Sequence, residues 1–346
     1  MRNDLKSILV IMPSWVGDFC MATPSLRHLR ANCPSAMIVA FGRPQLAPLA
    51  HGLASIDTFV GGAMRGPSGL REILALRARR FDAALVLPNS FRSALAARLT
   101  GARERAGTAR DGRSWLLTTA ISDPKGLRTA AAVYGRIVGE WLGTGSASGP
   151  PELTVTGQER EDAAKMLRSG PGAPPRRDWI LINPGAIRTD KRWAPAQFAR
   201  AALAIAESGL DGLARKRIAV TGSPSEAPLC AEVARACNAL DLCAGGITLA
   251  TLKGVLERTR LLITNDTGPS HMAAALATPC LTLFGPTDHR WTPSDYPLER
   301  RLIAEPFLIE SECADDRKTL CAIDRITAAD ASHAGIALVM RTSARG

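Results

Sequence analysis

The 346-residue chain has few aromatic side chains, at 5% of its residues, and no long apolar segment. No window reaches the about 18 uninterrupted apolar residues that a membrane span needs, so we expect no transmembrane helix. The eight cysteines include no C-x-x-C pair, which argues against a zinc knuckle and favours reduced core thiols. Neither half begins with a G-x-G-x-x-G turn, which disfavours a nicotinamide oxidoreductase.

Acidic residues are outnumbered, since 32 Asp and Glu oppose 43 Lys and Arg, for a formal net charge of +11. This balance favours anionic partners such as nucleic acid, phosphorylated substrates or an acidic membrane surface, or it serves solubility alone. Because the basic residues are scattered and aromatics are scarce, we do not expect nucleic-acid binding by base stacking.

The N-terminus runs straight into an apolar stretch that is typical of a strand, SILVIM at 7–12. It lacks an apolar region followed by a small-residue cleavage site, so we expect no signal peptide and a cytoplasmic location. Most cysteines should then be reduced, although Cys313 and Cys321 could pair in a loop.

Strand and helix patterns alternate along the chain, which predicts an α/β fold with parallel, doubly wound sheets. Short apolar runs place strands at 7–12, 37–41, 56–60, 81–87, 179–183, 217–221, around 242, at 261–263 and at 280–284. We expect residues 101–128 to be basic and irregular. The stretch GTGSASGPP at 143–151 follows a predicted helix rather than a strand, so we interpret it as a loop and not as a nucleotide-binding turn.

A Pro- and Gly-rich stretch at 171–177, PGAPPRR, is the predicted linker between two domains, 1–170 and 171–346. A final helix at 326–340 either stays with the second domain or packs back on the first. Two Rossmann-like halves would form a cleft, with ligands beyond the carboxyl ends of the strands.

The stretch LLITNDTGPSHMAAAL at 261–276 reads as a strand, a tight polar loop and a helix. Gly268 lets the backbone approach a ligand, and Pro269 or Ser270 can open the helix. Its first N–H groups and the helix dipole favour an anion. An ordinary strand-to-helix turn with a capping side chain is the competing interpretation.

Polar clusters follow the predicted strands at 14–18, 89–92, 185–192, 222–226, 265–271 and 285–288. Six stretches, in this order, resemble those of glycosyltransferase family 9, the lipopolysaccharide heptosyltransferases, and most closely the heptosyltransferase II group. They are ILVIMPSWVGD at 8–18, LPNSFRS at 87–93, NPGA at 183–186, KRW at 191–193, NDTG at 265–268 with His271, and FGPT at 284–287.

The resemblance implies a GT-B fold, with the acceptor on the N-terminal Rossmann-like domain and the nucleotide-sugar on the C-terminal one. It implies inverting transfer of L-glycero-D-manno-heptose from ADP-heptose to the lipopolysaccharide inner core. No metal and no cofactor are expected, and the basic surface would suit peripheral contact with the anionic inner membrane, where the lipid-linked acceptor lies.

Two residues are the candidates for catalysis. Asp18 follows the first strand and would be the general base that takes the proton of the acceptor hydroxyl; alternatively it only caps the next helix. Lys191 would neutralise the departing diphosphate; alternatively it is a surface lysine.

The remaining candidates divide between the two substrates. Gly222, Ser223, Glu226, Asp266, Thr267, Gly268 and His271 would bind the nucleotide-sugar, with Glu226 toward the ribose hydroxyls. Alternatively, Glu226 is a solvated acid at the start of a helix and His271 is a structural histidine. Asn89, Ser90, Arg92, Arg105 and Arg113 would bind the acceptor, because arginine suits phosphate and carboxylate. Arg110 and Arg113 could equally belong to a solvated face.

Three rival functions stay open. They are a family 9-like transferase with another nucleotide-sugar or acceptor, a GT-B nucleotide-sugar epimerase, and a non-catalytic nucleotide-sugar binding protein. An epimerase would need a second acid/base group near Asp18, and a binding module would have no use for Asp18 together with Lys191.

Overall fold

A computed structural model describes residues 5–122, 129–168, 177–210, 217–292, 296–304, 316 and 319–343. The predicted linker, apart from Arg177, and Cys313 of the suggested cysteine pair lie outside these residues. The chain divides into two compact units: Met1–Thr154 with Arg290–Pro293, and Val155–His289 with Ser294–Gly346.

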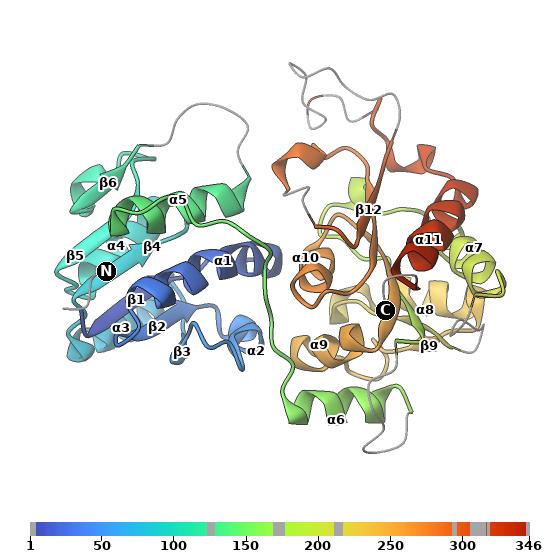
Figure 1. Ribbon diagram of the computed structural model, residues 1–346, viewed down its shortest axis with the longest axis horizontal. Helices are drawn as coiled ribbons and strands as arrows, with labels where there is room; N and C mark the ends of the chain where they lie inside the picture. Colours follow the sequence, from blue (N-terminus) through green and yellow to red (C-terminus); the bar gives the residue numbers. More distant parts are fainter. Residues whose placement is uncertain are drawn as a thin grey trace. The chain divides into compact units, whose positions relative to one another are not determined.

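The N-terminal unit holds a six-stranded sheet made of β1 (Ser7–Ile11), β2 (Met37–Gly42), β3 (Thr58–Gly61), β4 (Ala83–Val86), β5 (Glu104–Thr108) and β6 (Thr119–Ile121). The connecting helices are α1 (Val16–Asn32), α2 (Ala47–Ala50), α3 (Gly66–Ala75), η2 (Leu76–Arg79), α4 (Phe91–Leu99), η3 (Ser114–Leu116) and α5 (Ala130–Leu142). All pairings are parallel, in the order β3-β2-β1-β4-β5-β6 (Figure 1).

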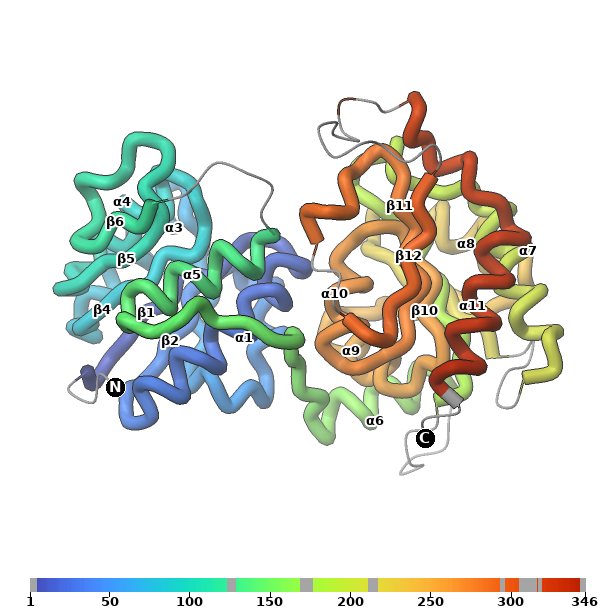
Figure 2. The backbone as a smooth tube through the Cα atoms, turned by 45° about the horizontal axis from the view of Figure 1, so that its top comes forward, coloured from blue at the N-terminus to red at the C-terminus, as the bar shows by residue number. Residues whose placement is uncertain are grey.

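Both faces of this sheet are buried, which is why its inner strands are continuous apolar runs rather than alternating ones. One face packs Leu9, Ile11 and Phe41 against α3 and α4. Helices α1 and α5 pack side by side, and α5 also contacts β4, β5 and β6 (Figure 2). The unit is therefore doubly wound, as the sequence predicted.

The C-terminal unit repeats this plan with β7 (Trp179–Asn183), β8 (Ile218–Val220), β9 (Leu240–Asp241), β10 (Thr259–Asn265), β11 (Cys280–Phe284) and β12 (Glu299–Ile303). Its helices are α6 (Gly157–Met166), η4 (Thr189–Lys191), α7 (Pro195–Ala206), η6 (Pro224–Glu226), α8 (Ala227–Cys237), α9 (Leu249–Glu257), α10 (Gly268–Ala275), η9 (Ile323–Arg325) and α11 (Ala328–Ser343). The strands are parallel, in the order β12-β11-β10-β7-β8-β9.

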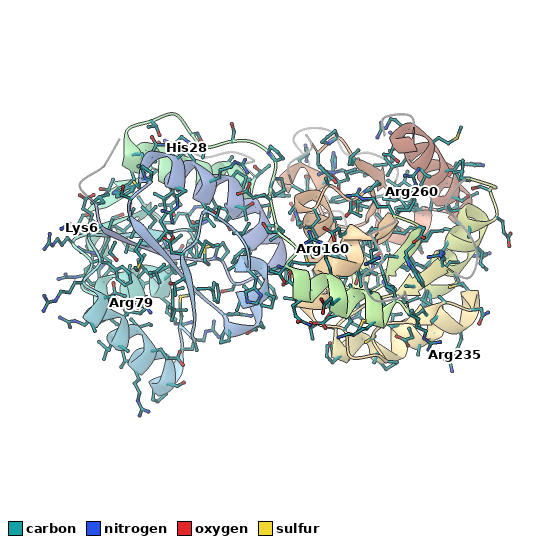
Figure 3. The ribbon with its side chains drawn as sticks, turned by 60° about the horizontal axis from the view of Figure 1, so that its bottom comes forward. Lys6, His28, Arg79, Arg160, Arg235 and Arg260 are labelled. Carbon is teal, nitrogen blue, oxygen red and sulfur yellow. The ribbon has the colours of Figure 1, made fainter. Side chains whose placement is uncertain are left out.

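Helices α7, α8 and α11 cover one face of the second sheet and share a core with its strands. The final helix α11 thus belongs to the C-terminal unit and lies along α7. Helix α6 also belongs to this unit, although the sequence placed it in the first domain. The reason is a buried ion pair 2.9 Å long between Glu159 on α6 and Lys253 on α9. Arg160 of α6, labelled in Figure 3, forms a second pair with Glu257 of α9.

The predicted strands agree with the structure wherever an apolar run marks them. Three strands were missed: β5 and β6, in the stretch expected to be irregular, and β12. The expectation of irregular structure was wrong because these strands are short, and β5 (ERAGT) and β12 (ERRLI) carry charged side chains that hide the apolar pattern. The loop prediction for 143–151 is confirmed.

No helix in the described part of the chain is long and apolar enough to cross a membrane. Of the cysteines within it, all except Cys243 are buried, which agrees with the expectation of core thiols.

In both sheets the strand order reverses direction at one place. Strand β1 lies between β2 and β4, and β7 lies between β8 and β10. At such topological switch points the loops leave the sheet to opposite sides, which opens a crevice beyond the carboxyl ends of the two strands. We refer to the loops after β1 and β4 as the first switch point and those after β7 and β10 as the second switch point.

Candidate active site

Asp18 lies at the first switch point, in the first turn of α1. The N-cap residue of this helix is Trp15, so Asp18 does not occupy the N-cap position of the competing interpretation. The hydroxyl of Tyr134, on α5, donates a hydrogen bond to Oδ1 of Asp18 across 3.1 Å. Burial, together with the charge of Asp18, raises the pKa of Tyr134, so the phenol remains a donor to the carboxylate. Sequence reasoning missed Tyr134, since it lies within an apolar helical stretch.

The loop after β4 is fixed by a buried arginine. Arg113 is fully buried, and its guanidinium donates to the carbonyl oxygens of Pro88, Ser90 and Thr108 at 2.6–2.9 Å. Burial lowers the pKa of Arg113 to about 10. The expected acceptor-binding role of Arg113 is therefore corrected. Its guanidinium binds backbone carbonyl oxygens inside the fold and positions the loop that carries Ser90.

Asn89 and Ser90 lie in that loop at the end of β4. Oδ1 of Asn89 accepts a hydrogen bond from Thr108 across 2.9 Å, and Ser90 caps α4 by accepting from the backbone of Ser93. Arg92, on the first turn of α4, is exposed. Three of the predicted acceptor residues are thus brought together at the first switch point.

Arg105 lies elsewhere. It lies near the start of β5, in register with Ala84 of β4. This is the amino end of the strands, whereas the switch point lies at their carboxyl ends. Its guanidinium donates to the carbonyl oxygens of Leu116 and Ala102 at 2.8 and 2.6 Å. We therefore correct its expected role from acceptor binding to linking β5 with the connection to β6. Arg110 is exposed in that connection.

At the second switch point a network of side-chain amides and hydroxyls joins the loops after β7 and β10. Nδ2 of Asn183 donates to Thr264 and Thr267 at 3.0 and 3.1 Å. Nδ2 of Asn265 donates to the carbonyl oxygen of Pro184 at 2.8 Å, and its Oδ1 accepts from the backbone of Trp193 at 3.2 Å. Buried amides with partners on both sides hold the two loops in one arrangement.

Trp193 explains the position of the lysine in the KRW stretch. Its indole is fully buried, packs edge-on against Phe198 and donates from Nε1 to the carbonyl oxygen of Ile326 across 2.8 Å. Because the tryptophan is fixed, Lys191 two residues earlier is held over the second switch point. Its Nζ donates to Oδ2 of Asp266 across 2.9 Å, with side chains 19% and 14% exposed.

Three of the matching stretches meet at Asp266. Its Oδ2 accepts from Lys191 of the KRW stretch and, across 3.2 Å, from Oγ1 of Thr287 of the FGPT stretch. The next residue, Thr267, is the N-cap of α10 and makes no side-chain cap bond. No acidic side chain lies in the first turn of α10, so its N-terminus presents N–H groups and positive dipole beside a lysine.

The loop after β8 lies against the loop after β7. Glu226 closes a capping box: its Oε2 accepts from the backbone and hydroxyl of Ser223 at 2.8 and 2.7 Å. A Cβ added to Gly185 would lie 2.2 Å from the Glu226 carboxyl carbon, and one added to Gly222 would lie 2.5 Å from Sγ of Cys230. Both glycines therefore allow close approach of neighbouring groups. His271 is half-buried on α10.

The described residues contain no group of three His, Cys, Asp or Glu side chains placed to share a metal ion. The chemistry of the two switch points is instead a carboxylate held by a phenol in one unit, and a lysine beside a helix N-terminus in the other. The second arrangement can stabilise a phosphate or diphosphate.

The fold is shared with the solved structure of E. coli ADP-heptose lipopolysaccharide heptosyltransferase II. The TM-score is 0.79 at 25% sequence identity, and the match covers 97% of this chain and 99% of that one. The two Rossmann-like units are therefore those of the GT-B fold, as in that glycosyltransferase.

Residues 70–326 match the family described as glycosyltransferase family 9 (heptosyltransferase). The lipopolysaccharide heptosyltransferase 2 of Salmonella typhimurium is 32% identical over 302 residues, which cover 83% of this chain and 84% of that protein. The Escherichia coli K12 protein of the same name is 31% identical over 314 residues, with coverages of 83% and 84%. The chain belongs to glycosyltransferase family 9.

Proposed function

We propose that this enzyme transfers L-glycero-D-manno-heptose from ADP-heptose to the inner core of lipopolysaccharide, with inversion and without a metal ion. The names of the relatives that match over 83% of the chain support the sugar and the acceptor. The solved relative named for ADP-heptose supports the donor. The observation that carries the proposal is the placement of Asp18 at one switch point and of Lys191, beside the N-terminus of α10, at the other.

On the acceptor side, Asp18 acts as the general base. Its carboxylate takes the proton of the acceptor hydroxyl while that oxygen attacks the anomeric carbon of the heptose. The bond from the anomeric carbon to the diphosphate oxygen breaks on the opposite face, so the configuration inverts and ADP leaves. Tyr134 occupies one carboxylate oxygen and fixes the rotamer of Asp18.

On the donor side, the developing charge of ADP is stabilised by fixed groups. Lys191 contributes the cation, and Thr267 and Gly268 lead into the N-terminus of α10, whose N–H groups face the diphosphate. Asp266 orients the lysine. Because these charges are fixed before the reaction, no metal ion is required for leaving-group departure.

The nucleoside end of the donor lies, in this proposal, over the loop after β8. Gly222 and Ser223 supply backbone close to the ligand, and the Glu226 carboxylate accepts hydrogen bonds from the ribose hydroxyls. His271 lies on α10, which begins at the second switch point, and contacts the donor. The capping box of Glu226 supports a pre-formed loop, since its conformation is set without a ligand.

Asn89, Ser90 and Arg92 bind the acceptor at the first switch point. The exposed guanidinium of Arg92 suits a phosphate or a carboxylate of the inner core. We propose a cytoplasmic enzyme that makes peripheral contact with the anionic inner membrane, where its acceptor is held. The net charge of +11 supports this, because anionic head groups attract basic surfaces.

A transfer assay tests the proposal. Purified protein is incubated with ADP-heptose and a core acceptor that lacks the heptose, once with magnesium and once with a chelator. The expected product is heavier by one heptose in both conditions, together with released ADP. A product formed only from a UDP- or GDP-sugar, or ADP release without a heavier acceptor, would contradict it.

A further inference from the structure

We propose that Phe91 and Trp115, continued by Trp15, form an aromatic stacking subsite for the sugar rings of the acceptor. This inference rests on the proposed function and adds a binding subsite to it. A pyranose ring has an apolar C–H face, and exposed aromatic rings are the side chains that pack against such a face.

The exposure of these side chains is the first observation. Among the described residues, the exposed aromatics are Trp15, Phe91, Trp115 and Trp291. Trp115 is 71% exposed, Trp15 53% and Phe91 40%. In a chain with only 5% aromatics, four exposed rings on the N-terminal unit, Trp291 included, are a feature to explain, because exposed apolar clusters mark interaction sites. Three of them, Trp15, Phe91 and Trp115, lie in the connections that follow strands of its sheet.

The sheet order brings these rings to one edge. Trp15 follows β1, Phe91 follows β4, and Trp115 lies in the connection after β5, and these three strands are consecutive neighbours. Asp18 comes from the same loop and helix start as Trp15.

Phe91 and Trp115 are a built pair. Their ring centroids lie 6.1 Å apart with an interplanar angle of 51°. Arg113, two residues before Trp115, donates to the carbonyl oxygen of Ser90, the residue before Phe91, across 2.9 Å. The buried arginine thus ties together the two backbone segments that carry the rings, which reduces the loop freedom lost on binding.

The charged side chains beside the rings indicate which ligand the subsite binds. The Arg43 guanidinium lies 5.4 Å from the centroid of the Trp15 ring, and Arg92 follows Phe91 directly and is exposed. Rings interleaved with arginines suit a ligand that has both apolar ring faces and negative charge, such as a sugar acid or a phosphorylated sugar. We commit to the anionic oligosaccharide of the acceptor, not its lipid, because Phe91 follows β4 at the same switch point as Asp18, which must reach a sugar hydroxyl.

Steady-state kinetics with a deacylated, soluble acceptor test this subsite. Trp115→Ala and Phe91→Ala are each expected to raise the KM for this acceptor about tenfold, with the KM for ADP-heptose unchanged. Trp115→Tyr should restore most of the acceptor affinity, since it keeps a stacking ring. Met37→Ala is the matched control: the exposure of Met37, 52%, lies between those of Phe91 and Trp115, but Met37 begins β2, at the amino ends of the strands and away from the first switch point.

Unchanged acceptor KM in both alanine variants would overturn the subsite. If their effect appears only with the acylated acceptor in anionic vesicles, the rings contact lipid and the inference is equally wrong. If the unmodified protein transfers no heptose, the proposed function fails by itself. Calorimetric titration with the deacylated acceptor then decides the subsite: weaker binding by Trp115→Ala than by Met37→Ala supports it, and equal binding overturns it.

Discussion

The hydroxyl of Tyr134 lies 3.1 Å from Oδ1 of Asp18 and donates a hydrogen bond to it, although the two residues are 116 positions apart. The contact joins α5 to the start of α1, where the two helices pack together. It leaves the phenol as a neutral donor that favours the charged form of the carboxylate. In the proposed mechanism Tyr134 is a positioning residue, because it acts through Asp18.

Replacing Tyr134 by Phe should therefore change the pH dependence of transfer more than the fold. The variant keeps the ring but loses the donor, so Asp18 is expected to become protonated at higher pH. The acid limb of the kcat/KM profile should therefore move to higher pH. An unchanged pH profile would show that the Tyr134 hydroxyl does not influence the protonation of the general base.

The two tyrosines of the chain, Tyr134 and Tyr296, should resist ionisation in the folded protein. Burial raises the pKa of both above the ordinary value of 10.0. In the folded state they therefore bind more protons than in the unfolded state once the pH exceeds about 10, so stability should fall as the pH rises further. Tyrosinate absorbance should be absent at pH 10 in native protein and present in denaturant. Half-ionised tyrosine in the native protein would contradict this.

Lys191→Ala should weaken ADP binding. The Lys191 side chain is only 19% exposed and its ammonium group is oriented by Asp266, so the substitution removes a fixed cation from the second switch point. We expect the Kd for ADP, measured calorimetrically without metal, to rise about tenfold, or about 1.4 kcal/mol. Arg188→Ala is the control, because Arg188 forms a more exposed pair with Asp190 in the same loop. Equal effects of both variants would argue for general charge instead of a specific contact.

Arg113→Ala should destabilise the N-terminal unit, because the carbonyl oxygens of Pro88, Ser90 and Thr108 lose their donors. A cost of about 3 kcal/mol in the free energy of unfolding is expected from denaturant titration. Arg92→Ala should leave stability within about 0.5 kcal/mol and raise the acceptor KM. The exposed Arg79, which projects from η2 (Figure 3), provides a control expected to change neither quantity. A stable Arg113→Ala variant would contradict the positioning role.

The strands that frame the two switch points could be predicted because they are buried on both faces and therefore appear as continuous apolar runs. The loops after them could be found by the same reasoning, since parallel strands present their carboxyl ends at one edge. The hydrogen-bond partners of the candidate residues could not be predicted. Nothing near Asp18 in the sequence indicates Tyr134, and the basic stretch around Arg105 and Arg113 does not reveal that both guanidinium groups bind backbone carbonyls. Such contacts depend on tertiary packing, which local patterns do not encode.

The role of Asp18 as the base of the proposed heptosyl transfer is tested by comparing Asp18→Asn with the unmodified enzyme. We expect kcat/KM with ADP-heptose and the core acceptor to fall by about a thousandfold, while ADP affinity is unchanged. The control Asp111→Asn, an exposed carboxylate of the same unit with φ 53°, should keep full activity. Transfer by Asp18→Asn within a few-fold of the unmodified rate would show that Asp18 is not the general base.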